Sequence, residues 1–211
     1  IIVSGILGGL FSKLIILSLR LRTGRIGLFR TKSPLLFAGA CGLLVALIGI
    51  LSQGDTYGTG YIHTQAIIAD SANTSYLFVP LKFIATWLST WAGVPAGIFA
   101  PALAIGGGIG NTISGALSLP EGQILIAIGM AGFLAAVTQA PMTSFIIVME
   151  MVNGHGLVLS LMASALIASG ISRMIGKPLY PALAQMQLKR VIKAKTEGGA
   201  SEGNHQAPPH S

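Results

Sequence analysis

The sequence predicts an all-α polytopic membrane protein with broken and re-entrant helices. Hydrophobic residues make up 52% of the 211 residues and charged residues only 9%, whereas about a quarter of the residues in an average soluble domain are charged. Long apolar runs alternate with shorter ones, and glycine and proline interrupt the later runs. The composition therefore excludes an ordinary soluble fold, and the uneven runs exclude a simple up-and-down bundle.

Two long apolar runs, residues 1–19 and 35–52, open the sequence. Each approaches the roughly 20 residues that a helix needs to cross a bilayer. A basic stretch, residues 20–32, separates them, and Ser33 and Pro34 are typical of a helix start because serine can cap the first turn and proline fits within it. Because the first residues are already apolar and lack Met, we expect the sequence to begin inside a transmembrane helix.

The middle of the sequence is less regular. Residues 53–74 are polar apart from a short apolar piece, residues 62–69, which is too short to span a membrane. Residues 76–92 are predicted to form a third long span. Glycine and proline then cluster in residues 93–101, and such a cluster breaks a helix. The remaining helices are predicted at residues 98–117, 123–138, 142–152 and 157–174.

Two helix breaks, at residues 93–101 and 139–141, are candidate sites. Irregular backbone at membrane depth is tolerated only where it is buried in protein or lines a cavity, because lipid cannot bond the freed peptide groups. In transporters built from broken helices, the N-termini of half-helices point at anions near the middle of the membrane. The first break has the composition that this arrangement requires.

The segment from Gly97 to Pro101 has the pattern of an anion site at a helix start. Pro101 fits a first turn without losing a needed donor, and Gly97 lets a neighbour or ligand come close. The N–H groups of Ile98 and Phe99 would then face forward with the positive end of the helix dipole behind them. The same spacing is equally compatible with a kink between two core helices.

Four ordered stretches resemble signature segments of the CLC chloride channels and proton/chloride exchangers. Residues 97–101 are similar to the family's GxFxP motif, and residues 57–61 resemble its glycine-rich start of a short helix. Residues 139–151 resemble its APxxxxxxxxEM helix, and residues 176–180 resemble the segment that carries a chloride-coordinating tyrosine. The resemblance covers about residues 1–190.

The resemblance implies the C-terminal half of a CLC-type transmembrane domain, which is one half of the family's inverted repeat. Residues 1–190 would form this half, and residues 191–211 are predicted to be a disordered tail. The amides of Ile98 and Phe99 and the hydroxyl of Tyr180 would then contact chloride. Tyr180 suits this role because a phenol donates a hydrogen bond without a charge; without the resemblance, an interfacial anchor would be the favoured interpretation.

Within this resemblance the sequence is compatible with a voltage-gated-type chloride channel or with a proton/chloride antiporter. The family's gating glutamate and central serine belong to motifs of its N-terminal half, and these motifs do not occur in the sequence. Selectivity for fluoride or nitrate is an alternative. A membrane-embedded enzyme is a remote alternative, because no histidine or carboxylate pair has a catalytic spacing. We expect no cofactor and chloride as the bound substrate.

The resemblance also implies a homodimer in which each subunit has its own anion pathway, with chloride, protons and the lipid bilayer as partners. Nucleic acid is not an expected partner, because the net charge of +7 comes from helix flanks without interleaved aromatic residues. The absence of paired CBS domains from the sequence favours a prokaryotic inner (plasma) membrane. Basic residues near the end predict a cytoplasmic C-terminus. The same rule places residues 20–32 inside, but the family fold places their counterpart outside, and we adopt the latter.

Several other features have competing interpretations. Glu150 lies deep in an apolar stretch, where its carboxylate either bonds loop amides, which we favour, or relays protons. Lys82 either attracts anions or extends to a helix end. The glycines of residues 106–110 are assigned to helix packing, because no Lys-Ser or Lys-Thr follows them. His63 and His155 have no second ligand at a metal-binding spacing, so no metal site is predicted.

Overall fold

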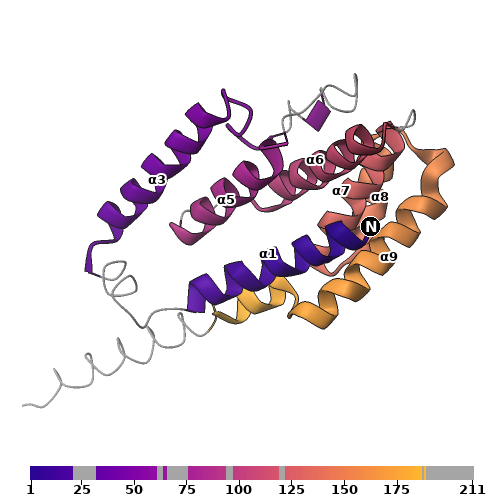
Figure 1. Ribbon diagram of the computed structural model, residues 1–211. Helices are drawn as coiled ribbons and strands as arrows, with labels where there is room; N and C mark the ends of the chain where they lie inside the picture. The colour runs from indigo at the N-terminus through magenta and orange to yellow at the C-terminus, as the bar shows by residue number, and fades with distance from the viewer. Residues whose placement is uncertain are drawn as a thin grey trace, which may run out of the picture.

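The computed structural model describes residues 1–20, 32–60, 64–65, 76–93, 97–118, 122–186 and 188, and the regular secondary structure in them is helical (Figure 1). The predicted all-α fold is confirmed for them. Most predicted helix ends agree with the observed ones within one or two residues. The elements are α1 (Ile2–Arg20), α3 (Pro34–Leu51), α5 (Phe78–Trp91), α6 (Phe99–Leu117), α7 (Gly122–Thr138), α8 (Pro141–Met151), the 3-10 turn η1 (His155–Leu157) and α9 (Val158–Ile175).

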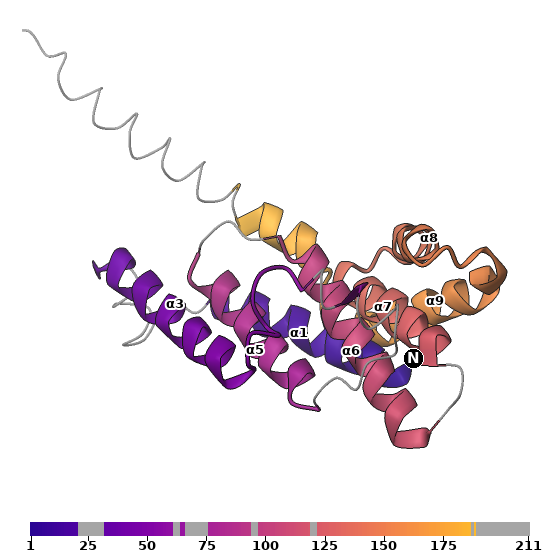
Figure 2. The same ribbon diagram turned by 90° about the horizontal axis from the view of Figure 1, so that it is seen from above.

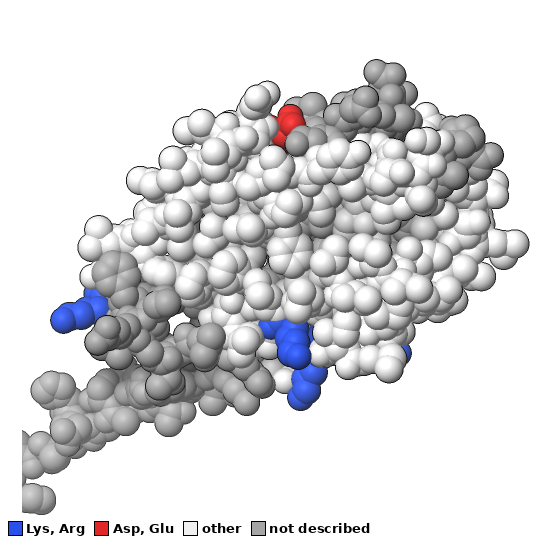
Figure 3. Space-filling view, viewed as in Figure 1, with Lys and Arg blue, Asp and Glu red and all other residues white. Residues whose placement is uncertain are grey.

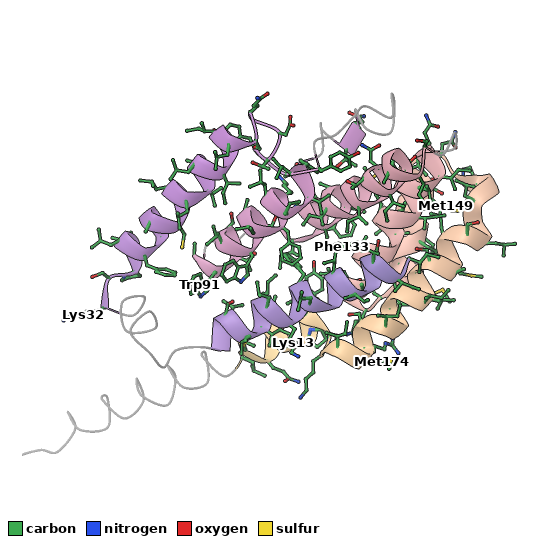
Figure 4. All side chains as sticks on the ribbon, viewed as in Figure 1. Lys13, Lys32, Trp91, Phe133, Met149 and Met174 are labelled. Atoms are coloured by element: carbon green, nitrogen blue, oxygen red, sulfur yellow. The ribbon has the colours of Figure 1, made fainter. Side chains whose placement is uncertain are left out.

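Helix α7 is the centre of the bundle, and α1, α6, α8 and α9 all pack against it. Figure 2 shows α7 among these helices, with α3 at the opposite side of the molecule. Apolar residues on every side of α7 are buried, which is expected of a helix enclosed in the core. Phe133 of α7 lies near Phe11 of α1, with ring centroids 6.0 Å apart, in the interior of the bundle (Figure 4).

Serine side chains attach two neighbouring helices to the backbone of α7. The hydroxyl of Ser12 in α1 donates to the carbonyl of Val137 at 3.2 Å. From α9, Ser164 donates to the carbonyl of Ile128 at 2.8 Å. A further bond of this kind runs from Ser172 to Ala136. These bonds satisfy buried hydroxyls where lipid offers no partner.

The glycines of residues 106–110 lie within α6 at its crossing with α7. A Cβ on Gly106 would lie 2.6 Å from the carbonyl oxygen of Gly129 and 2.8 Å from the Cα of Met130. Backbone therefore meets backbone at this crossing, as small residues permit in membrane helices. The assignment of these glycines to helix packing is confirmed.

Within the described residues, three helical segments are long and apolar enough to cross a membrane: Ile2–Leu19, Pro34–Leu51 and His155–Ile175. The third long span that the sequence predicted at residues 76–92 is shorter in the structure. It corresponds to α5, which has only 14 residues and is not among these three segments. Tyr76 and Leu77 form a turn before it, and Gly93 ends it with a φ of +83°, a conformation that glycine adopts without strain. The sequence composition alone overestimated this helix.

Helix α3 packs on α5 and leaves most of its surface uncovered by the rest of the described chain. The contact includes Phe37 and Trp91, whose rings meet edge to face with centroids 5.2 Å apart. Pro34 is the first residue of α3, as predicted, and Ser33 precedes it without a side-chain capping bond among the described residues. An apolar helix with so little protein cover is suited to a lipid environment.

Candidate functional site

The first candidate site is the start of α6. The helix begins at Phe99, with Ile98 at the N-cap position and Pro101 in the first turn, as the sequence predicted. No side chain among the described residues caps this helix start. The first turn of a helix leaves amide groups without intrahelical acceptors, and the helix dipole makes that end partially positive. The start of α6 can therefore receive an anion.

The burial of this segment differs from residue to residue. Ile98 is buried in the main apolar cluster, and Phe99 packs against the same cluster. Gly97 is exposed, and a Cβ built on it would meet no atom of the described residues within 4 Å. Of the two expected neighbours of Gly97, protein or ligand, protein is therefore not found among these residues. The open side of Gly97 leaves room for a ligand instead.

A cavity of about 300 Å³ opens beside this helix start, and both Gly97 and Pro101 line it. Its other walls come from α5 and from the loop after α3. The lining is rich in hydroxyl side chains: Thr56, Thr59, Thr86, Ser89 and Thr90. The hydroxyls of Thr86, Ser89 and Thr90 donate to backbone carbonyls of α5, so these side chains make the cavity wall polar without offering it a free donor.

Lys82 also lines this cavity, and sequence reasoning did not foresee its bonding. Its side chain is only 2% exposed, so the interpretation that it extends to a helix end is wrong. The ammonium donates to the carbonyl oxygens of Thr56 and Gly58, at 2.8 and 2.9 Å. A local pattern could not have revealed partners that lie 26 and 24 residues away in the sequence.

The second candidate break, at residues 139–141, is confirmed. Gln139 has a φ of +55°, and Pro141 begins α8. The side-chain amide of Gln139 donates to the carbonyl oxygen of Gly176 at 3.0 Å. This bond joins the second break to the segment that leads to Tyr180. Two stretches chosen separately from the sequence are therefore in direct contact.

Tyr180 lies near the start of a helical stretch, residues 179–186, after α9. Its neighbour Leu179 is fully buried in the same apolar cluster as Ile98. The Tyr180 side chain itself is 44% exposed, and it is not among the residues that line the cavity at Gly97. Partial burial raises the pKa of the Tyr180 phenol above its ordinary value, so the hydroxyl stays a neutral donor.

Glu150 does not have the environment that the sequence indicated. Its side chain is exposed at the end of α8. The loop after the helix bonds the backbone of Glu150 instead, because the amide of Asn153 donates to the Glu150 carbonyl. The expected bond from the carboxylate to loop amides is not found among the described residues. His155 is exposed in η1. Within the described ranges, no three His, Cys, Asp or Glu side chains are grouped as metal ligands.

Charged side chains are unevenly distributed over the molecule. Figure 3 shows Lys and Arg along the lower edge and acidic atoms at the upper edge. Lys13 and Lys32 are both on the lower side in Figure 4. Lys32 ends the stretch of residues 20–32, most of which lies outside the described residues. The side of the membrane on which residues 20–32 lie therefore stays a prediction.

Known proteins match this chain over most of its length. The profile of the family described as "Voltage gated chloride channel" matches residues 2–173. The H(+)/Cl(-) exchange transporter ClcA of Klebsiella pneumoniae is 33% identical over 190 residues, which are 84% of this chain and 38% of the relative. The ClcA of Yersinia pestis is 32% identical over 180 residues, 79% of this chain and 36% of the relative. The ClcA of Salmonella typhimurium is 29% identical over 186 residues, 84% of this chain and 38% of the relative.

The chain thus spans less than two fifths of the length of these curated relatives. The family match nevertheless covers all the described helices from α1 to most of α9. It agrees with the three membrane-spanning candidates and with the all-helical fold. The chain is part of an integral membrane protein and belongs to the voltage-gated chloride channel (CLC) family.

Proposed function

We propose that this chain forms one side of an anion pathway in a chloride transporter, with the amides of Ile98 and Phe99 and the hydroxyl of Tyr180 as chloride ligands. The observation that carries the proposal is the uncapped start of α6 beside a hydroxyl-lined cavity. An anion there gains hydrogen bonds and a favourable helix dipole without a fixed counter-charge. Gly97 and Pro101 shape the site, because one leaves it open and the other fits the first turn.

We propose proton/chloride exchange rather than a passive channel, because the relatives compared above are named as exchangers. Chloride and protons would then be the transported substrates, without catalysis of a chemical reaction. A pathway selective for fluoride or nitrate is the alternative. Proton flux driven by a chloride gradient in liposomes separates exchange from a channel, and competing anions in the same assay determine selectivity.

The proposed assembly is a homodimer in a bacterial inner membrane, with the C-terminus in the cytoplasm. The family resemblance supports the dimer and the bacterial relatives support the membrane. The basic edge that includes Lys13 supports a cytoplasmic side for that edge. Light scattering of the purified protein in detergent tests the dimer, and a protein of monomeric mass would contradict it.

Bromide soaked into crystals of the full gene product tests the ligand assignment, because bromide replaces chloride and scatters anomalously. We expect an anomalous peak within hydrogen-bonding distance, about 3.5 Å or less, of the amide nitrogens of Ile98 and Phe99. Bromide density found only elsewhere would refute the proposed site.

The substitution Tyr180→Phe tests the third ligand. It removes one hydrogen bond to a charged group, which corresponds to a loss of about 1.5–3 kcal/mol and thus to a roughly tenfold or larger rise in the halide Kd. Tyr76→Phe is the matched control, because Tyr76 is 68% exposed and precedes α5. Equal halide affinities for the two variants, measured by calorimetry, would exclude Tyr180 as a ligand.

A further inference from the structure

Lys82 is a buried cation whose bonds are directed at backbone. Its side chain is 2% exposed, and its partners are the carbonyl oxygens of Thr56 and Gly58 at 2.8 and 2.9 Å. A buried charge is costly unless it is well bonded, and bonds from an ammonium to carbonyls are stronger than neutral ones. The lysine therefore holds the loop after α3 firmly.

The loop is also fitted closely against α6. A Cβ on Gly60 would lie 2.7 Å from the Cβ of Ala104 and 3.2 Å from the Cε of Lys82. Gly60 is thus enclosed between α6 on one side and the lysine stem on the other. Its φ of +82° adds a second reason for glycine at this position.

This arrangement forms one wall of the cavity at the start of α6. Ala104 lies one helical turn after Pro101, and Pro101 lines the cavity together with Gly97. Thr56, Tyr57, Gly58 and Thr59 of the loop line the same cavity. A displacement of the loop would therefore change the space directly beside Gly97.

We propose that Lys82 is a positioning residue of the anion pathway: its ammonium clamps residues 56–60 against α6 and so fixes the cavity wall beside Gly97 and Pro101. This inference rests on the proposed anion site at the start of α6. The role differs from simple attraction of anions, because two of the three ammonium donors are already directed at carbonyls. The charge acts through the loop that it holds.

The loop can be displaced while the charge is kept. Gly60→Ala introduces a methyl group where Ala104 and Lys82 leave no room, whereas a Cβ on Gly54 would meet only the Tyr57 ring, at an ordinary contact distance of 3.7 Å. Both glycines have φ values that other residues rarely adopt, +82° and +98°, and Gly54 neither lines the cavity nor bonds Lys82. Gly54→Ala is therefore the matched control, and Lys82→Met removes the clamp itself while keeping an apolar stem.

The experiment measures bromide affinity by calorimetry in the full gene product. We expect Lys82→Met and Gly60→Ala each to raise the bromide Kd by roughly tenfold, the effect of losing about one charge-assisted hydrogen bond. Gly54→Ala should stay within about twofold of the unsubstituted protein. An unchanged Kd in Gly60→Ala beside a raised one in Lys82→Met would show that the charge acts directly and would overturn the clamp. Equal losses in both alanine variants would overturn it as well.

Hydrogen exchange gives a second measurement that requires neither halide binding nor the Gly60 variant. We expect faster amide exchange in residues 56–60 of Lys82→Met, unchanged exchange in α9, and recovery in Lys82→Arg, whose guanidinium can also donate to carbonyls. Unchanged exchange in residues 56–60 would overturn the clamp. Failure of the proposed function is distinguishable, because then the unsubstituted protein itself binds no bromide at the start of α6.

Discussion

Replacing Gly106 by alanine tests the crossing of α6 and α7 on which the bundle depends. The new Cβ would lie 2.6 Å from the carbonyl oxygen of Gly129 and 2.8 Å from the Cα of Met130, whereas ordinary contacts lie at 3.4–4 Å. Both atoms are backbone, so the helices must move apart. Overpacking of this kind costs about 1–3 kcal/mol.

Gly115→Ala is the matched control for Gly106→Ala. Gly115 is exposed in the same helix, and a Cβ there meets no atom of the described residues within 4 Å. Alanine gains about 1 kcal/mol of helix propensity at either position, so the difference between the two variants isolates the crossing. We expect Gly106→Ala to be less stable than Gly115→Ala by about 1–3 kcal/mol.

The assay for this pair is reversible unfolding in mixed micelles with a rising fraction of denaturing detergent, followed by tryptophan fluorescence. The expected difference corresponds to a roughly 5- to 150-fold change in the unfolding equilibrium constant. Equal free energies of unfolding for the two variants would show that α6 and α7 tolerate a methyl group at their crossing. The close backbone approach would then not be a source of stability.

Two further predictions concern the segment that contains Tyr180. Gln139→Ala removes the bond to the carbonyl of Gly176, and we expect a loss of about 1 kcal/mol in unfolding free energy together with weaker halide binding. The exposed Gln123→Ala is its control, and the idea fails if both variants bind halide alike. The ordinary pKa of a tyrosine hydroxyl is near 10, and burial raises the pKa of Tyr180 further. The hydroxyl therefore stays protonated between about pH 6 and pH 9, and we expect halide affinity not to fall through phenol ionisation in this range. A fall within that range that Tyr180→Phe abolishes would contradict this assignment.

The helices could be predicted from sequence where apolar length and proline coincide. Pro34 and Pro141 begin α3 and α8, and both positions follow from the fixed φ of proline and its missing N–H. The end of α5 was also indicated, because a glycine follows it at positive φ. The start of α5 was not indicated by the sequence. Tyr76 and Leu77 are apolar enough to continue the helix, but they form a turn before it.

The candidate site could be predicted only where its elements are local. The start of α6 is defined by five consecutive residues, and its position follows from glycine and proline alone. Contacts between distant segments left no such signal. The bonds of Lys82 to the loop and of Gln139 to Gly176 depend on how helices pack, and an isolated lysine or glutamine looks alike in many environments.

The central position of α7 has a consequence for how the protein is made. Its partners are synthesised at different times, because α1 ends about 100 residues before α7 begins and α9 follows α7. The carbonyls of Ile128 and Ala136 receive their serine donors only from α9. A nascent chain that ends before Val158 therefore lacks the helix that covers one side of α7 and donates to both carbonyls. The bundle closes around α7 only after Ser172 has left the ribosome.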